Sequence, residues 1–301
     1  VLRRMLLDSL KPGTVLWDSH FISMEAGQSM DAKSRMNPGT MLRDSRENPK
    51  EANQSDHQGW TMHFKNGSST YADLVIAADG ANSKLRPYVT DIKPFFSGIT
   101  MLEGNVYDAE KKVPNISALL KGGKIMAFGN KQDILMGQKG NGEIGFYASF
   151  YSDEDWAKTS GINFSDNEAM LSWFKKEYAG WSHVWDELFL QATTPFIPRP
   201  IYCIPFDQAW EPLPNLTLLG DAAHVMPPFA GEGVNMAMLD ALELSEVFAS
   251  PGVNSLHHAI AQYEISMRKR ASSIAKESLE NGQRMHAENA LETMLDFFQG
   301  K

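Results

Sequence analysis

Apolar residues recur along the chain at two spacings, one typical of helices and one typical of strands. Helical spacing predicts helices at residues 2–10, 234–248 and 256–285. Runs rich in β-branched and aromatic residues predict strands at residues 14–22, 60–65, 70–78 and 216–219. Asn66-Gly67 is a strong hairpin-turn signal, and the apolar run at 74–78 predicts a buried parallel strand.

Residues 93–200 show a different pattern, with short alternating strands separated by Gly and Asn turns. The expected strands are residues 125–129, 133–138 and 143–151, and helices rich in Trp, Phe and Leu are expected at 167–178 and 181–191. The pattern therefore predicts a mainly antiparallel sheet, covered on one face by helices and inserted into an α/β domain. The expected boundaries are 1–90 with 201–250 for the α/β domain, 91–200 for the insert, and 251–301 for a C-terminal helical segment.

Residues 24–58 interrupt the α/β domain with a polar segment that has almost no large apolar side chains. Such a composition cannot offset the entropy lost on ordering. We expect a mobile insertion there. The chain also begins at Val1 and enters directly into a helical pattern, so an upstream segment is expected to precede it.

Composition excludes several classes of function. The net charge of -9 and the absence of clustered Lys and Arg argue against a nucleic-acid partner. Cys203 is the only cysteine, which excludes an intramolecular disulfide and a cysteine-rich zinc site, and no metal site is expected. No stretch reaches the roughly 18 to 20 apolar residues that a membrane span needs. A cytoplasmic monomer is expected.

The segment around Gly220 and Asp221 carries the most specific chemical signal. The predicted strand 216–219 ends in this Gly-Asp pair, and ligands of open α/β sheets bind beyond the carboxyl ends of strands. Asp221 is therefore placed to accept hydrogen bonds from a polyol such as a ribityl or ribose chain. Alone, a Gly-Asp pair could equally be an ordinary turn.

A glycine-rich turn follows at residues 228–235 and opens the predicted helix at 234. Unpaired N–H groups at a helix start carry partial positive charge, which suits a ring that becomes anionic on reduction. The residues of this turn that are candidates for contact with such a ring are Pro228, Gly231, Gly233, Val234 and Asn235.

Asp79 and Gly80 follow the buried strand predicted at 74–78, and Ser83 and Arg86 come next, at the start of an expected helix. This arrangement would suit pyrophosphate or the phosphates of a nicotinamide cofactor. An isolated Asp-Gly pair is a common turn, so the motif gains weight only beside the Gly-Asp motif.

Taken together, these motifs resemble those of FAD-dependent aromatic-hydroxylase-type monooxygenases, from residue 1 nearly to the C-terminus and with closest fit to the tetracycline-modifying branch. The resemblance implies a Rossmann-like FAD-binding domain of the p-hydroxybenzoate hydroxylase type, with an inserted substrate-domain sheet and a long C-terminal helix. It implies that Gly220 and Asp221 contact the ribityl chain, that residues 228–235 lie beside the isoalloxazine, and that Arg3 helps fix the pyrophosphate. A solvated surface arginine is the alternative for Arg3.

The implied function is hydroxylation of a phenolic or polycyclic small molecule with FAD, NAD(P)H and O2 through a flavin C4a-hydroperoxide. The cofactor supplies that chemistry, so no catalytic side chain is expected, and His224 is expected to pack or hydrogen-bond below the flavin. The chain departs from the family because it lacks the Gly-x-Gly-x-x-Gly turn that holds the ADP half of FAD. The alternatives are a flavin oxidase or dehydrogenase of the same fold, or a truncated remnant without FAD or catalysis.

Overall fold

The computed structural model describes residues 2–28, 58–250 and 255–300, which form two compact units. The first unit contains residues 1–91, 210–223 and 240–265, and the second contains 92–209, 224–239 and 266–301. Helices α8 (Gly233–Ala249) and α9 (Leu256–Met285) contribute residues to both units. Because the division runs through two helices, the domain boundaries expected from the sequence stay a prediction.

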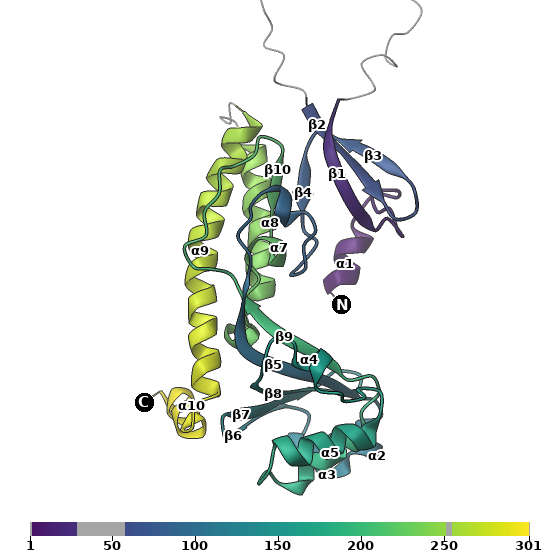
Figure 1. The fold of residues 1–301 in the computed structure, drawn as a ribbon, viewed down its shortest axis with the longest axis vertical. Helices are drawn as coiled ribbons and strands as arrows, with labels where there is room; N and C mark the ends of the chain where they lie inside the picture. Colours follow the sequence, from purple (N-terminus) through teal and green to yellow (C-terminus); the bar gives the residue numbers. More distant parts are fainter. Residues whose placement is uncertain (1, 29–57, 251–254, 301) are drawn as a thin grey trace, which may run out of the picture. The chain divides into compact units, whose positions relative to one another are not determined.

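The first unit contains two small sheets (Figure 1). One is antiparallel, in the order β1 (Phe21–Gln28), β2 (Gln58–Phe64) and β3 (Ser69–Ala72), and follows helix α1 (Leu2–Asp8). The hairpin turn between β2 and β3 contains Gly67 at φ +83°, as Asn66-Gly67 predicted. The other sheet pairs β4 (Val75–Ala77) with β10 (Leu216–Leu218) in parallel. The parallel strand is thereby confirmed, but it is buried on one face only, because Ile76 is 41% exposed.

Two strand predictions in the first unit were wrong in their bounds. The strand expected at 14–22 begins only at Phe21, because Asp18 has a left-handed backbone (φ +58°) that interrupts an extended run. The run at 70–78 divides into β3 and β4, which belong to different sheets. Residues 24–28 lie in β1 with Met24 buried, so the polar segment begins later than expected, and its remainder at 29–57 lies outside the described residues.

The second unit is built on a five-stranded antiparallel sheet in the order β6-β7-β8-β5-β9. Its strands are β5 (Phe95–Val106), β6 (Lys124–Gly129), β7 (Gln132–Gln138), β8 (Ile144–Tyr151) and β9 (Ile197–Cys203). The three strands expected from the sequence match β6, β7 and β8. The pattern did not reveal β5, whose alternation is interrupted by Gly98 and Gly104, nor β9, whose two prolines are tolerated at a sheet edge.

The two faces of this sheet pack against different partners. On one face, side chains of β8 such as Phe146 and Phe150 pack in an aromatic core with α5 (Asn167–Glu177) and α6 (Asp186–Gln191). On the other face, Ile99 and Met101 pack with Phe229. The shorter helical segments of the unit are α2 (Ala109–Lys112), α3 (Pro114–Leu120), α4 (Trp156–Thr159), η3 (His183–Trp185), η4 (Pro228–Ala230) and α10 (Ala290–Gln299).

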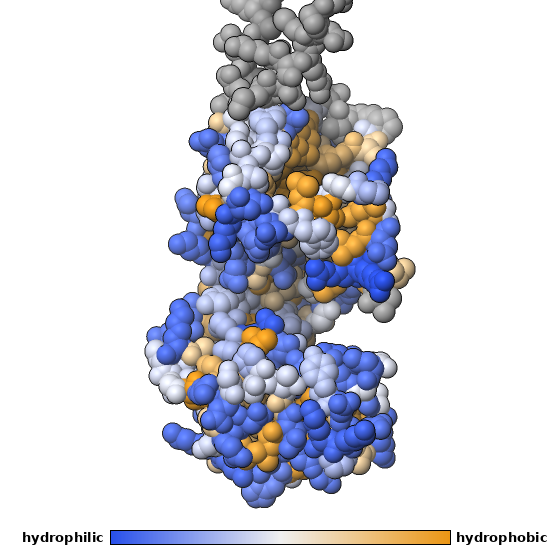
Figure 2. Space-filling model, turned by 90° about the vertical axis from the view of Figure 1, so that its right-hand side faces the viewer, coloured by the Kyte–Doolittle hydropathy of each residue, from blue (hydrophilic) through white to orange (hydrophobic). Residues whose placement is uncertain are grey.

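The α/β class, the antiparallel sheet within it and the long C-terminal helix are confirmed, and α9 has the bounds that the apolar spacing predicted. None of the described helices is long and apolar enough to cross a bilayer. Figure 2 shows a mainly hydrophilic surface with separate hydrophobic patches. In the first unit, such exposed apolar side chains include Leu2, Met5 and Leu6 of α1.

Candidate functional site

Two exposed carboxylates lie just beyond the carboxyl ends of adjacent parallel strands in the first unit. Asp79 follows β4 and Asp221 follows β10, and the strands are joined up to their ends by a hydrogen bond from Leu219 N to Ala77 O (3.0 Å). Parallel strands present their carboxyl ends at one edge, where ligands of open α/β sheets bind. The structure thus brings the two motifs to the same sheet edge.

Asp79 organises the loop that follows it. Its Oδ1 accepts a hydrogen bond from Ser83 Oγ (2.6 Å), and its Oδ2 accepts one from Lys84 N (2.7 Å). Ser83 Oγ in turn accepts from Arg86 N (2.9 Å), at the start of η2 (Arg86–Tyr88). Between them, Gly80 has φ +82°, a conformation that side chains with a Cβ rarely adopt.

Gly220 is held by a carboxylate that the sequence analysis did not identify. Its N–H donates to Asp240 Oδ2 (2.9 Å), and Asp240 is fully buried on α8. Gly220 has φ +59° and directly precedes α7 (Asp221–His224). A buried carboxylate that accepts a backbone N–H fixes the position of the loop while leaving the Asp221 side chain exposed to solvent.

Arg86, which follows the Asp-Gly motif, binds the backbone next to the Gly-Asp motif. Its buried guanidinium Nη1 donates to Ala222 O (3.0 Å) and Ala223 O (2.7 Å), and it lies 5.7 Å from the Trp210 ring centroid. Burial lowers the pKa of Arg86 from its usual value. The sequence suggested that Arg86 would serve phosphate, but these contacts give it a structural role in holding the Gly-Asp loop.

Polar side chains of helix α9 form hydrogen bonds with strand β10. The buried Glu264 accepts hydrogen bonds from Thr217 Oγ1 and from Trp210 Nε1, both at 2.8 Å. Tyr263 Oη donates to Leu218 O (3.0 Å). These bonds hold the strand that carries Gly220 and Asp221 against the long helix.

The glycine-rich turn belongs to the second unit and is described there by itself. Pro228 begins η4, and Gly231 ends it at φ +72°. Asn235 Nδ2 donates to Glu232 Oε2 (3.0 Å) in the first turn of α8. Gly233 begins α8, where a Cβ would meet nothing within 4 Å, and Val234 is 67% exposed.

Helix α9 also holds this turn. Ser278 Oγ accepts from Ala230 N (3.0 Å) and donates to Pro227 O (2.5 Å). A Cβ on Gly282 would lie 2.5 Å from Phe229 Cδ2, so the Phe229 ring rests on the helix backbone. Ser278 and Gly282 were not among the residues predicted from the sequence. A glycine within an otherwise strong helical pattern was the available signal of a close approach.

Two candidates remain, Arg3 and His224. Arg3 is exposed on α1, and within the described residues no hydrogen bond or ion pair joins it to the Gly-Asp or Asp-Gly loops. His224 is fully buried at the end of α7. Among the described residues, no group of three or more His, Cys, Asp or Glu side chains is arranged to hold a metal ion.

Comparison with known proteins identifies the region that carries the Gly-Asp motif. Residues 214–278 match the FAD binding domain family model, which covers Gly220, Asp221 and the turn at 228–235. The chain is 26% identical over 228 residues to 6-hydroxynicotinate 3-monooxygenase of Bordetella bronchiseptica, covering 73% of this chain and 55% of that protein. The chain therefore spans about half the length of the curated relatives that it matches.

Solved structures show the same fold at low sequence identity. The structure of Klebsiella pneumoniae HpxO complexed with FAD and uric acid matches with a TM-score of 0.67 and 21% identity, covering 99% of this chain and 66% of that one. Tetracycline destructase Tet(51) matches with a TM-score of 0.55 and 18% identity, covering 80% of this chain and 64% of that one. These likenesses confirm the expected FAD-binding hydroxylase fold.

Proposed function

We propose that this chain, a relative of the FAD-dependent aromatic hydroxylases, is the part of an FAD-dependent monooxygenase that holds the flavin and the aromatic substrate. The observation that carries the proposal is the placement of Asp79 and Asp221 beyond the carboxyl ends of two adjacent parallel strands. Substrates named for its relatives, such as 6-hydroxynicotinate, support a substituted aromatic ring as the substrate class.

The residues at this edge fit the ribityl part of FAD. A polyol needs hydrogen-bond acceptors for its hydroxyl groups, and the exposed Asp221 carboxylate offers them on a loop fixed by Asp240 and Arg86. Gly220 keeps the backbone open beside it. Asp79 uses both oxygens to order its own loop, and each oxygen has further lone pairs for a ligand hydroxyl.

Residues of the turn at 228–235 are proposed to contact the isoalloxazine, and Arg3 the pyrophosphate. When bound, FAD supplies the oxygen-activating redox chemistry, and the protein supplies position and exclusion of water. The hydrogen bonds from Ser278 fix the path of the turn, so its backbone is preorganised. NAD(P)H as the reductant, O2 as the second substrate, a monomeric state and a cytoplasmic location are parts of the same proposal.

The test replaces Asp221 with alanine and measures FAD affinity by fluorescence quenching, in this chain and in any longer natural form of it. Charge-assisted hydrogen bonds are worth roughly 1.5 to 3 kcal/mol each, so Asp221→Ala should weaken FAD binding by about ten- to a hundred-fold. Asp73→Ala is the matched control, because Asp73 is also exposed but precedes β4 at the opposite end of the strand. Equal affinity of the Asp221 variant and the parent would refute the assignment.

A second measurement separates hydroxylation from oxidase or dehydrogenase activity on the same fold. The FAD-loaded protein is given NADH or NADPH, a panel of phenolic and heteroaromatic acids, and oxygen labelled with ¹⁸O. Incorporation of one labelled oxygen atom into a ring product is the expected result. Hydrogen peroxide formation with no labelled product from any substrate would contradict monooxygenation.

A further inference from the structure

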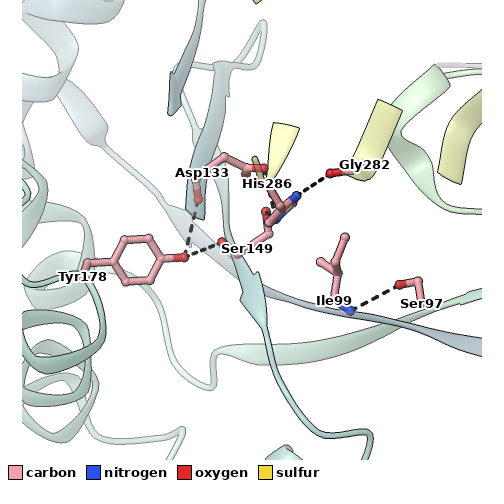
Figure 3. A network of polar contacts seen from close by, with 7 residues as sticks. All are labelled: Ser97, Ile99, Asp133, Ser149, Tyr178, Gly282 and His286. Atoms are coloured by element: carbon pink, nitrogen blue, oxygen red, sulfur yellow. Dashed lines mark hydrogen bonds and ion pairs between the residues drawn. The ribbon is translucent and has the colours of Figure 1, made fainter. Parts of the chain in front are cut away.

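A buried polar cluster lies in the second unit, on the face of the sheet that packs against Phe229 (Figure 3). Asp133 of β7 and Ser149 of β8 are register partners on adjacent strands, and His286 follows the end of α9. All three side chains are at most 1% exposed. Neither the flavin-binding proposal nor the family motifs use any of them.

The contacts of the His286 ring determine which of its nitrogens carries hydrogen. Nδ1 lies 2.8 Å from Gly282 O, and a carbonyl oxygen can only accept, so Nδ1 donates. Nε2 lies 3.0 Å from Ser149 Oγ and 3.4 Å from Asp133 Oδ2. Within the described residues, neither carboxyl oxygen of Asp133 has a hydrogen-bond donor with good geometry.

This arrangement holds one proton between Asp133 and Nε2 of His286. If the proton is on Asp133, Nε2 is free to accept the Ser149 hydroxyl; if it is on Nε2, the pair is an ion pair. Both states are neutral overall. Removing the proton leaves an unpaired buried carboxylate, and adding a second leaves an unpaired buried cation, and each is costly in a dry interior.

The pKa shifts of Asp133 and His286 agree with the geometry, since each favours the neutral form of its group. Burial raises the pKa of Asp133 to about 7, with a smaller opposing effect of Ser149. Burial also lowers the pKa of His286, opposed in part by its backbone hydrogen bond to Gly282.

The other titratable or charged groups around the cluster do not donate or take up this proton. Tyr178, beside α5, donates its hydroxyl to Ser149 O (2.9 Å), and burial raises its pKa well above the usual value, so it stays neutral. The Tyr151 ring packs edge-on to His286 at 5.5 Å. The nearby charges lie outward, on Glu177 and on the exposed ion pair of Lys131 with Glu288 (3.1 Å).

The cluster contacts the turn at 228–235 through Phe229. The His286 ring meets the Phe229 ring edge-on at 5.7 Å, and Phe229 lies against the backbone of Gly282, whose carbonyl binds Nδ1 of His286. One turn earlier on α9, Ser278 binds the turn on both sides of Phe229. Phe229 thus contacts both the His286 ring and the part of α9 that binds His286.

We propose that Asp133 and His286 share a single proton and act as positioning residues that hold Phe229, and with it the turn at 228–235, in one place. The assignment of this turn to the isoalloxazine rests on the proposed function above. The shared proton and the coupling to the turn do not, and they are testable without FAD.

The test uses the 301-residue chain and two measurements. Long-range ¹H–¹⁵N NMR of the histidine rings follows protonation of His286, and hydrogen exchange follows the amides of residues 229–231. In the parent, His286 should show no change of protonation between about pH 5 and 8, the range in which an unperturbed histidine titrates. A His286 ring that gains a proton across this range would overturn the shared proton.

Three variants test the coupling. His286→Ala should speed exchange at 229–231 by at least about tenfold, since local opening no longer has to break the Phe229 contact. Asp133→Asn, a neutral isostere of the protonated carboxyl, should keep that protection. Lys131→Ala, which removes only the exposed ion pair to Glu288, is the matched control and should change nothing. Unchanged exchange at 229–231 in His286→Ala would overturn the proposal, as would loss of protection in Asp133→Asn to the level of His286→Ala.

Discussion

Replacing Arg86 with methionine should destabilise the first unit more than any other single arginine change in it. The side chain is buried and donates to two carbonyl oxygens of the loop that carries Asp221, at 3.0 and 2.7 Å. Methionine is close in length and apolar, so it preserves most of the packing while removing the charge and both bonds. The variant therefore isolates the polar contribution.

The magnitude follows from the two hydrogen bonds and the cost of burying the charge. Hydrogen bonds to a charged group are worth roughly 1.5 to 3 kcal/mol each, so two of them contribute about 3 to 6 kcal/mol. Part of this hydrogen-bond energy offsets the cost of removing the guanidinium from water, and that cost is absent in the methionine variant. We expect a net loss of about 3 kcal/mol in the free energy of unfolding.

The assay is urea unfolding followed by tryptophan fluorescence, since Trp60 and Trp210 report on the first unit. Arg86→Lys should show an intermediate loss, because an ammonium group lacks the fork that reaches two carbonyls together. Arg4→Met is the matched control: Arg4 is 88% exposed and, among the described residues, forms an ion pair only with the exposed Asp8 on α1, so its loss should leave the transition unchanged. An Arg86→Met variant within about 0.5 kcal/mol of the parent would refute the reasoning.

Two further predictions concern single carboxyl groups. Asp79→Ala should speed hydrogen exchange at Lys84 and Leu85 and cost about 1 to 2 kcal/mol of stability, because it removes the acceptor for the loop's N–H groups; Asp73→Ala should leave both unchanged. His286→Ala should make stability fall as pH rises from about 4 to 7, by up to about 1.4 kcal/mol per pH unit, as urea midpoints measured across that range would show. In that variant, the folded state keeps a proton on Asp133 that the unfolded state releases across this pH range. In the parent, the folded pair holds one proton and the unfolded chain also holds one, on His286, so the dependence of stability on pH is nearly cancelled. A flat profile in the variant would contradict the raised pKa of Asp133.

The sequence revealed the parts of the site that depend on local chain geometry. Gly80, Gly220 and Gly231 have positive φ in the structure, and each lies in a turn that the motif positions predicted. Asp221 follows strand β10, which its apolar residues predicted without any tertiary contact. The assignment of these residues to FAD stays a prediction, while the match of residues 214–278 to an FAD binding domain agrees with the family resemblance.

Residues that act through long-range contacts could not be read in the same way. Asp240, Glu264 and Ser278 lie in helices whose apolar spacing gave no sign that these polar side chains were buried. Each is satisfied by a group far away in sequence, such as Gly220 N for Asp240 and Pro227 O for Ser278. A helical pattern reports which face is apolar, not which polar groups meet a partner there.

The sequence by itself therefore determined the α/β class, the long helix α9, the existence of strands β4 and β10 with the parallel character of β4, and the turns that require glycine. It did so because strand and helix periodicity and positive φ are properties of short segments. Only the tertiary structure decided that Arg86 binds the Gly-Asp loop and that Asp133 meets His286. Those pairings join residues more than a hundred positions apart, and their energy comes from burial that exists only once the chain has folded.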